Sequence, residues 1–217
     1  MNIAIDGPAG AGKSTIAKLV AKELGFLYVD TGAMYRSIAL YFIENNVNLE
    51  EEQEISDACS KINIEIKYED GVQQVYLNDR NVSTLIRQEQ VGNMASKAAA
   101  KKAVRDKLLS LQRDIAAEND VIMDGRDIGT FVLPDAEIKI YLTASVKTRA
   151  KRRYDELVAK GENPDIEKIE ADIEQRDYQD MNREIAPLKQ AEDAVYLDTS
   201  DMNIEQVVAY ICNLTKK

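Results

Sequence analysis

Five short apolar segments, each followed by turn residues, predict β-strands along the chain. These segments cover residues 2–5, 26–29, 121–123, 138–142 and 194–197. Between and after them, apolar residues recur at helical spacing, and the helices expected from this spacing span residues 14–24, 33–45, 146–160 and 204–214. Strands that alternate with helices predict an α/β fold, with a parallel five-stranded sheet and helices on both faces.

The segment from about residue 60 to 84 interrupts this alternation. Apolar and polar residues alternate with period two over residues 62–68. Turn signals at 69–71 and 78–81 enclose a second apolar segment at 72–77. This pattern predicts a small antiparallel β insert.

A long helical stretch is expected after the insert, from Leu85 to about Glu118. At 217 residues, the chain has the length of one large domain with a modest insertion. We therefore expect a single domain, residues 1–217, that consists of a core, an insert and a further helical segment. The core comprises residues 1–59, 119–148 and 184–217, the insert comprises about 60–118, and the helical segment comprises about 149–183.

The segment between the first predicted strand and helix is rich in glycine. Residues 7–14, GPAGAGKS, fit the phosphate-binding pattern G-x-x-x-x-G-K-[ST] at every position. Glycines let backbone N–H groups turn toward a phosphate, and the helix N-terminus adds partial positive charge. In this pattern Lys13 reaches the β- and γ-phosphates, and the Ser14 hydroxyl can bind Mg²⁺. The loop alone leaves open a kinase, an ATPase and a switch GTPase, although no N-K-x-D guanine-binding tetrapeptide occurs.

Aspartates end four of the five predicted strands: Asp6, Asp30, Asp124 and Asp198. Ligands of open parallel sheets bind at the carboxyl ends of the strands, so these side chains are candidates for a site. Turn formation or helix capping also accounts for an aspartate at such a position, and we prefer that interpretation for Asp198.

The amino-acid composition disfavours some binding functions and excludes histidine-dependent catalysis. The chain carries 38 acidic and 28 basic residues, and its net charge of −10 disfavours sequence-independent binding of nucleic acid or a membrane surface. Because it has no histidine, His-based triads, His-containing metal sites and a His general base are excluded. Cys59 and Cys212 have no CxxC spacing and are expected to be reduced thiols in a cytoplasmic protein. We expect no bilayer span and no signal peptide.

Two arginines lie just past predicted strands, in loops that contain glycine. Arg36 follows the second strand and Arg126 follows the third. Together with Lys13 they predict a local anion site, because the planar guanidinium binds two phosphate oxygens at once. A solvated surface charge is the alternative for each.

Two predicted helical faces carry the remaining candidates: Arg149, Arg152 and Arg153 on one, and Arg176, Asp180 and Arg183 on the next. Such a helical hairpin is suited to close over a nucleotide as a lid and to exclude water from phosphoryl transfer. Ion pairing with neighbouring acidic residues is the alternative interpretation.

Several sequence blocks, taken in order, resemble the bacterial-type cytidylate kinases, a family of P-loop nucleoside monophosphate kinases. Besides residues 5–14 they are DTGAMYR at 30–36, DGRDIGT at 124–130, the pairs RD at 176–177 and NR at 182–183, and APL at 186–188. The β insert also resembles the insert that distinguishes the bacterial enzymes within this fold.

The resemblance implies phosphoryl transfer from ATP, with Mg²⁺, to CMP or dCMP. The implied donor-binding residues are Gly7, Pro8, Ala9, Gly10, Ala11, Gly12, Lys13, Ser14 and Thr15, with Arg149, Arg152 and Arg153 in a mobile lid over ATP. The implied substrate-binding residues are Arg36, Arg126 and Arg183 for the acceptor's phosphate, Ser96, Arg105 and Asp127 for cytosine, Arg176 and Asp180 for ribose, and Asp30 and Thr31 beside them. The implied catalytic residues are Lys13, Arg126, Arg153 and Arg183, and the implied metal ligand is Ser14. Asp30 and Asp124 are candidates either for water-mediated Mg²⁺ binding or for positioning arginines.

Such chemistry needs no strong base, because the attacking group is already an anionic phosphate oxygen. A kinase for another small acceptor, such as UMP, shikimate or gluconate, is the nearest alternative, and a nucleotide-dependent switch is a more distant one. A nucleic-acid-binding module is disfavoured by the acidic charge, by the absence of Trp and by the presence of only 3 Phe. We expect a monomer that binds small-molecule substrates.

Overall fold

The computed structural model describes residues 1–69 and 72–216. The chain forms two compact units. The first unit comprises Met1–Tyr28 and Asn119–Lys217, and the second comprises Val29–Glu118. Among the described residues, no helix combines the length and the apolar character that a bilayer span requires.

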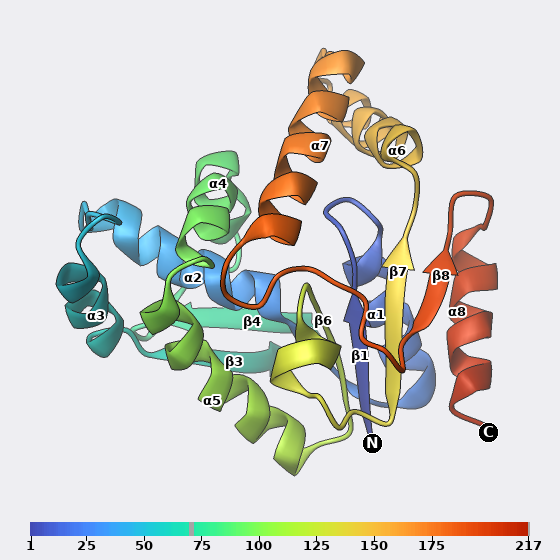
Figure 1. The fold of residues 1–217 in the computed structure, drawn as a ribbon, viewed down its shortest axis with the longest axis horizontal. Coiled ribbons are helices and arrows are strands. Elements are labelled where there is room, and N and C mark those ends of the chain that lie inside the picture. The colour runs from blue at the N-terminus through green and yellow to red at the C-terminus, as the bar shows by residue number, and fades with distance from the viewer. Residues whose placement is uncertain (70–71, 217) are drawn as a thin grey trace. The chain divides into compact units, whose positions relative to one another are not determined.

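A five-stranded sheet contains all five predicted strands, each within two residues of its expected bounds (Figure 1). The strands are β1 Asn2–Asp6, β2 Leu27–Asp30, β6 Val121–Gly125, β7 Ile138–Thr143 and β8 Val195–Asp198, in the order β2-β6-β1-β7-β8. Strand β1 pairs in parallel with β6 and β7, and β7 pairs in parallel with β8. The carboxyl end of β1 therefore lies between those of β6 and β7, where parallel sheets place their ligands.

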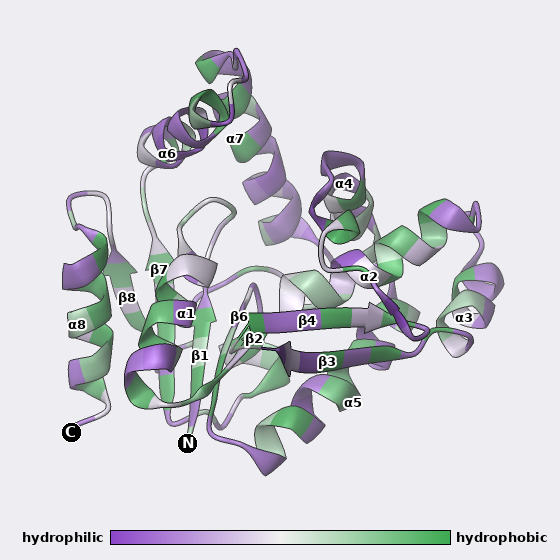
Figure 2. Cartoon of the chain, turned by 180° about the vertical axis from the view of Figure 1, so that it is seen from behind, coloured by the Kyte–Doolittle hydropathy of each residue, from purple (hydrophilic) through white to green (hydrophobic). Residues whose placement is uncertain are grey.

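Four helices and one π-helical turn complete the first unit: α1 Lys13–Leu24, η2 Ile128–Val132, α6 Val146–Ala159, α7 Ile166–Asn182 and α8 Ile204–Leu214. Helices α1 and α8 pack together, and Figure 2 shows them in front of the sheet. Their apolar faces bury the sheet residues Ile3, Ile5 and Leu142 in one core. Helices α6 and α7 pack against each other as the expected hairpin.

The second unit contains the insert. Its elements are α2 Thr31–Glu44, α3 Glu52–Ser60, β3 Ile64–Glu69, β4 Val72–Leu77, β5 Arg80–Asn81, η1 Leu85–Arg87, α4 Glu89–Ala98 and α5 Lys102–Glu118. The predicted antiparallel meander is confirmed as the sheet β3-β4-β5. Its first turn signal, at 69–71, lies partly outside the described residues. The second turn is shorter than expected, because Asn78 and Asp79 with φ of 46° and 67° complete it and Arg80 already pairs with Leu77.

The expected helix from Leu85 to Glu118 is wrong as a single element. It is divided into η1, α4 and α5, with extended backbone at Gln88 and a turn at residues 99–101. Helix α4 packs on α2, whereas α5 packs on both α2 and α3. The break lets Val91 and Ala98 of α4 and Val104 and Leu108 of α5 be buried against these neighbours. Helix α3 was not predicted, because only Ile55, Ala58 and Cys59 of its nine residues are buried.

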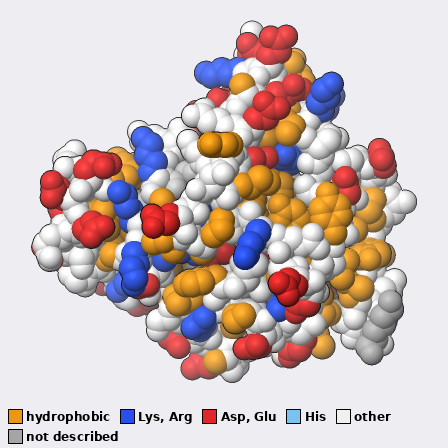
Figure 3. Space-filling view, viewed as in Figure 1, with side chains coloured by type: hydrophobic (Ala, Val, Ile, Leu, Met, Phe, Trp, Pro, Cys, Tyr) orange, Lys and Arg blue, Asp and Glu red, His pale blue; other side chains and the backbone are white. Residues whose placement is uncertain are grey.

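Charged side chains of both signs are interspersed on the face of the molecule shown in Figure 3. No continuous basic surface of the kind used by nucleic-acid-binding proteins is visible on that face among the described residues. This distribution is consistent with the net charge of −10.

Candidate active site

The phosphate loop connects β1 to α1 and depends on glycine at its first position. Gly7 has a φ of +150°, and a Cβ at this residue would lie 1.9 Å from the carbonyl oxygen of Leu142 in β7. Gly12, with a φ of +87°, turns the chain into the first residue of α1. The loop therefore passes close to the neighbouring strand and then presents its backbone at the N-terminus of α1, which is the geometry that binds phosphate.

Lys13 is the first residue of α1, and its side chain is buried inside the loop. Its Nζ donates a hydrogen bond of 2.8 Å to the carbonyl oxygen of Pro8. Burial, followed by the charge of Arg126, lowers the pKa of Lys13 to about 7, although Asp124, Asp6 and Asp180 act in the opposite direction. An ammonium held by one carbonyl and destabilised by burial gains stability when a phosphate arrives.

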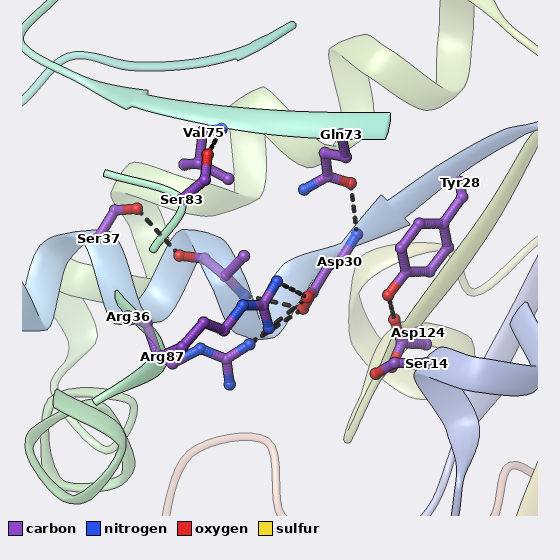
Figure 4. A network of polar contacts seen from close by, with 11 residues as sticks. Ser14, Tyr28, Asp30, Arg36, Ser37, Gln73, Val75, Ser83, Arg87 and Asp124 are labelled. Carbon is purple, nitrogen blue, oxygen red and sulfur yellow. Dashed lines mark hydrogen bonds and ion pairs between the residues drawn. The ribbon is translucent and has the colours of Figure 1, made fainter. Parts of the chain in front are cut away.

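Ser14 and Tyr28 both hydrogen-bond to Asp124 at the end of β6 (Figure 4). The Ser14 hydroxyl donates to Asp124 Oδ2 at 2.8 Å, and the Tyr28 hydroxyl donates to Oδ1 at 2.9 Å. No group of three or more acidic or cysteine residues that could hold a metal occurs in the described part of the chain. A hydroxyl backed by one carboxylate fits Mg²⁺, since this ion keeps several waters and takes ligands from substrate phosphates.

Two arginine–aspartate pairs lie on the loop after β6 and at the end of α7. Arg126 Nε lies 2.7 Å from Asp180 Oδ2, and Arg183 Nη2 lies 3.1 Å from Asp127 Oδ1. Arg183 also approaches Asp180 at 4.0 Å and donates from Nε to the carbonyl oxygen of Ala186 at 2.6 Å. Four of the predicted acceptor-binding residues are therefore brought together, as alternating charges.

Asp180 keeps its charge because of this arrangement. Burial works to raise the pKa of Asp180, but ion pairing with Arg126 outweighs it and holds that pKa below its usual value. The charge of Arg176, one turn earlier on α7, acts in the same direction. Arg176 and Asp180, the implied ribose contacts, thus share one face of α7, with Asp180 buried and Arg176 half-buried.

Asp6 links the phosphate loop to the loop after β6, which the sequence did not predict. Its Oδ1 accepts a hydrogen bond from the backbone N–H of Ile128 at 2.8 Å, and its Oδ2 accepts one from Gly129 at 2.7 Å. Burial raises the pKa of Asp6 to about 6, although these two bonds and Lys13 favour the charged form. The carboxylate immediately before the phosphate loop therefore fixes the backbone that follows Asp127.

Arg149, Arg152 and Arg153 lie at the i, i+3 and i+4 positions of α6, but their side chains have different partners. Arg149 is buried and donates to the carbonyl oxygens of Ala144 and Ala9, both at 2.9 Å, and its Nη2 lies 2.7 Å from Asp177 of α7. Arg152 donates to the carbonyl oxygen of Thr199 at 2.8 Å.

Arg153 is exposed and pairs with Glu156 at 2.9 Å. Its contact is the i,i+3 ion pairing that was the alternative for these arginines. The structure therefore joins Arg149 to the phosphate loop and to α7, while Arg152 and Arg153 contact other partners.

In the second unit, Asp30 organises the start of α2. Its Oδ1 caps the helix by accepting from the Ala33 N–H at 2.9 Å, and its own N–H donates to Gln73 of β4 at 3.0 Å. Arg36 Nη2 lies 3.5 Å from the carboxylate, and Arg87 Nη2 lies 3.1 Å from it (Figure 4). The adjacent Thr31 is buried. Arg87 was not among the predicted site residues.

The two implied cytosine-reading residues of this unit lie on α4 and α5. Ser96 is half-buried on α4. Arg105 is buried on α5, where it donates to the carbonyl oxygen of Ala99 at 3.2 Å and lies 5.9 Å from the ring centroid of Tyr35. Asp127, the third implied reader, belongs to the first unit.

Comparison with known proteins covers the whole chain. The cytidylate kinase family model matches residues 3–217. The cytidylate kinase of Lactobacillus gasseri is 52% identical over 217 residues, which is 100% of this chain and 94% of that protein. The cytidylate kinase of Carboxydothermus hydrogenoformans is 50% identical over 214 residues, which is 99% of this chain and 96% of that protein.

A solved structure gives an independent comparison of the fold. The shikimate kinase from Bacteroides thetaiotaomicron matches with a TM-score of 0.50 at 14% identity, covering 100% of this chain and 99% of that one. At this identity the likeness concerns the fold, which both chains build around a sheet flanked by helices. With a family match over residues 3–217 and relatives 52% and 50% identical over 94% and 96% of their lengths, the chain belongs to the cytidylate kinase family.

Proposed function

We propose that this chain transfers the γ-phosphoryl group of ATP to CMP and dCMP, giving ADP and CDP or dCDP. The observation that carries the proposal is the glycine loop, whose buried Lys13 reaches across to the Pro8 carbonyl, in a chain of the cytidylate kinase family. In the reaction, an oxygen of the acceptor's phosphate forms a bond to the γ-phosphorus, and the bond from that phosphorus to the leaving ADP oxygen breaks.

The residues of the phosphate loop would bind the donor. We propose that the backbone from Gly7 to Thr15 surrounds the β- and γ-phosphates and that Lys13 exchanges its carbonyl partner for a phosphate oxygen. Arg149 would hold the loop through Ala9, and Arg153 would extend from the lid toward ATP. Ser14 and Asp124 would hold Mg²⁺. When bound, the ion would neutralise charge on the phosphates.

The arginines would bind the acceptor and offset its charge. In the first unit we propose that Arg126 and Arg183 bind the acceptor's phosphate, that Asp127 accepts a hydrogen bond from the cytosine amine, and that Arg176 and Asp180 contact the ribose. In the second unit we propose that Arg36 binds the acceptor's phosphate and that Ser96 and Arg105 read the base. No general base is required, because the second ionisation of a phosphate monoester has a pKa of about 6.

An assay of ADP release, with ATP and Mg²⁺ and each of CMP, dCMP, UMP and AMP in turn, tests the proposal. We expect turnover with CMP and dCMP and little with the other two. A Lys13→Ala variant purified in the same way is the control for contaminating kinases. Turnover with UMP but not with CMP, or ADP release that ignores every acceptor, would contradict the proposed function.

We also propose that the enzyme works as a monomer in the cytoplasm. Cys59 and Cys212 are both free and buried, which is usual in a reducing compartment and supports that location. Light scattering coupled to gel filtration tests the oligomeric state. A mass near 24.3 kDa is expected for the monomer, and twice that mass would contradict it.

A further inference from the structure

In the second unit, two arginine side chains approach the buried carboxylate of Asp30. The carboxylate is nearly inaccessible, with 5% of its side chain exposed, and the guanidinium groups of Arg36 and Arg87 both approach it. Figure 4 shows the two guanidinium groups converging on the same carboxylate.

The fold holds Arg87 at this place. Arg87 ends η1, and the preceding Ile86 is completely buried. The Ile86 N–H donates to the carbonyl oxygen of Val82 at 3.0 Å, and the Arg87 N–H donates to Thr84 at 3.1 Å. Element η1 also packs on α2, which carries Arg36. The backbone on both sides of the pair is thus fixed, so the two guanidinium groups are held beside each other at a small entropic cost.

Arg87 retains binding capacity after it has paired with Asp30. A guanidinium has five N–H donors, and Asp30 is the one acceptor that the Arg87 side chain has among the described residues. Its side chain is 52% exposed, and Figure 4 shows the second terminal nitrogen directed away from Asp30. A half-exposed guanidinium next to a second guanidinium suits a phosphate, because each planar group can bind two phosphate oxygens.

We propose that Arg87 is a phosphate-binding residue for the acceptor nucleotide, paired with Arg36 and oriented by Asp30. This inference rests on the proposed function, since the acceptor is the phosphate monoester that the reaction supplies. Arg36 and Arg87 would each bind phosphate oxygens of the acceptor, while Asp30 keeps both guanidinium groups from turning into solvent. The alternative is that Arg87 only stabilises the start of α2 through Asp30.

The test is the variant Arg87→Gln, with Arg80→Gln as the matched control. Arg80 belongs to the same unit, is 49% exposed and pairs with Glu44 at 2.7 and 2.8 Å, so the control also removes a half-exposed arginine from a carboxylate. Calorimetry measures the binding of CMP and of ATP, and thermal unfolding measures stability. Since hydrogen bonds to charged groups contribute about 1.5–3 kcal/mol, we expect Arg87→Gln to weaken CMP binding roughly 10- to 100-fold and to leave ATP binding unchanged.

A comparison of CMP with cytidine distinguishes phosphate binding by Arg87 from a purely structural role of this residue. Inhibition by cytidine, which has no phosphate, should be the same for the wild type and Arg87→Gln, and Arg87→Lys should restore part of the CMP affinity. Equal CMP affinity in Arg87→Gln and Arg80→Gln would overturn the inference, as would an equal loss of CMP and ATP binding. A wild-type protein that fails to bind CMP at all would overturn the proposed function as well, so the two failures are distinguishable.

Discussion

At the scale of single residues, the most informative groups are ionisable side chains buried next to the phosphate loop. Lys13 and Asp6 carry opposite charges, and burial disfavours the charged form of each. Both are held by backbone atoms, Lys13 by one carbonyl and Asp6 by two N–H groups. A nucleotide bound to the phosphate loop would change the surroundings of these two groups, so their protonation states should differ between the free and the bound enzyme.

Proton uptake on nucleotide binding tests the role of Lys13. With a pKa of about 7, roughly half of the Lys13 side chains are neutral at pH 7 in the free enzyme, and a bound polyphosphate raises that pKa. We expect ADP binding at pH 7 to take up about half a proton more in the wild type than in Lys13→Met. Calorimetry in two buffers of different ionisation enthalpy measures this difference. Equal proton uptake by the wild type and Lys13→Met would show that Lys13 does not contact the bound phosphates.

The stability of Asp6→Asn at two pH values tests the burial of that carboxyl group. Since the pKa of Asp6 rises from 3.8 to about 6 on folding, the native state holds this proton more tightly. The wild type therefore loses stability on this account as the pH rises from about 4 to 6, by about 3 kcal/mol in total. Asn cannot ionise, so the free energy of unfolding of the wild type relative to Asp6→Asn should be higher at pH 4.5 than at pH 7.

Denaturant titrations at the two pH values measure this difference. Asp201→Asn, a change at an exposed carboxyl, is the control. A stability difference between the wild type and Asp6→Asn that is the same at both pH values would contradict a buried, proton-binding Asp6.

At the scale of elements, the close approach of the phosphate loop to β7 fixes how β1 leads into α1. The carbonyl of Leu142 occupies the place where a side chain at residue 7 would begin. Helix α1 then starts directly after Gly12 and lies against β6 and α8. The position of the loop therefore depends on a close backbone contact between residue 7 and β7.

Two glycine-to-alanine changes should have opposite effects. Gly7→Ala places a Cβ 1.9 Å from a strand carbonyl and should destabilise the protein by at least about 2 kcal/mol, because overpacking forces the backbone to move. Gly92→Ala, within α4, meets no atom within 4 Å and should stabilise it by about 0.5–1 kcal/mol through helix propensity. Thermal unfolding of the two variants measures the difference. Full stability in Gly7→Ala would show that the loop can shift away from β7.

The elements that the sequence predicts are those with a strong local signal. All five strands of the main sheet and helices α1, α2, α6 and α8 follow from apolar runs and helical spacing. Helix α3 and the break after α4 could not be predicted, because they depend on which neighbours bury a few apolar side chains. The same holds for the different partners of the three α6 arginines, since Arg149 contacts Ala9, which is 140 residues away in the chain.

The candidate site also contains some residues with a local sequence signal and others that depend on distant partners. The phosphate loop and the Arg126 and Arg183 motifs are continuous patterns, so the sequence predicts them. Asp6 and Arg87 have hydrogen-bond partners 122 and 57 residues away in the chain, and only the fold brings these groups together. An aspartate at a strand end was visible as a candidate, whereas nothing local to Arg87 distinguished it from other arginines.

At the scale of the whole molecule, an acidic chain must bind two polyanions. In the first unit, Lys13 and the N-terminus of α1 supply positive charge, while Asp180 and Asp127 hold Arg126 and Arg183 and balance their charges. This arrangement suits transfer between two phosphates, in which positioning and charge neutralisation replace proton chemistry. It accounts for a kinase without a single histidine.

Transfer of the phosphoryl group from ATP to CMP is tested most directly by ³¹P NMR of ATP, Mg²⁺ and CMP incubated with the enzyme. We expect the ADP and CDP signals to grow equally, no free phosphate to appear, and the reaction to approach the same equilibrium from either side. Lys13→Ala should leave the spectrum unchanged over the same time. Growth of ADP together with inorganic phosphate, and no CDP, would show that the enzyme hydrolyses ATP and would contradict phosphoryl transfer to CMP.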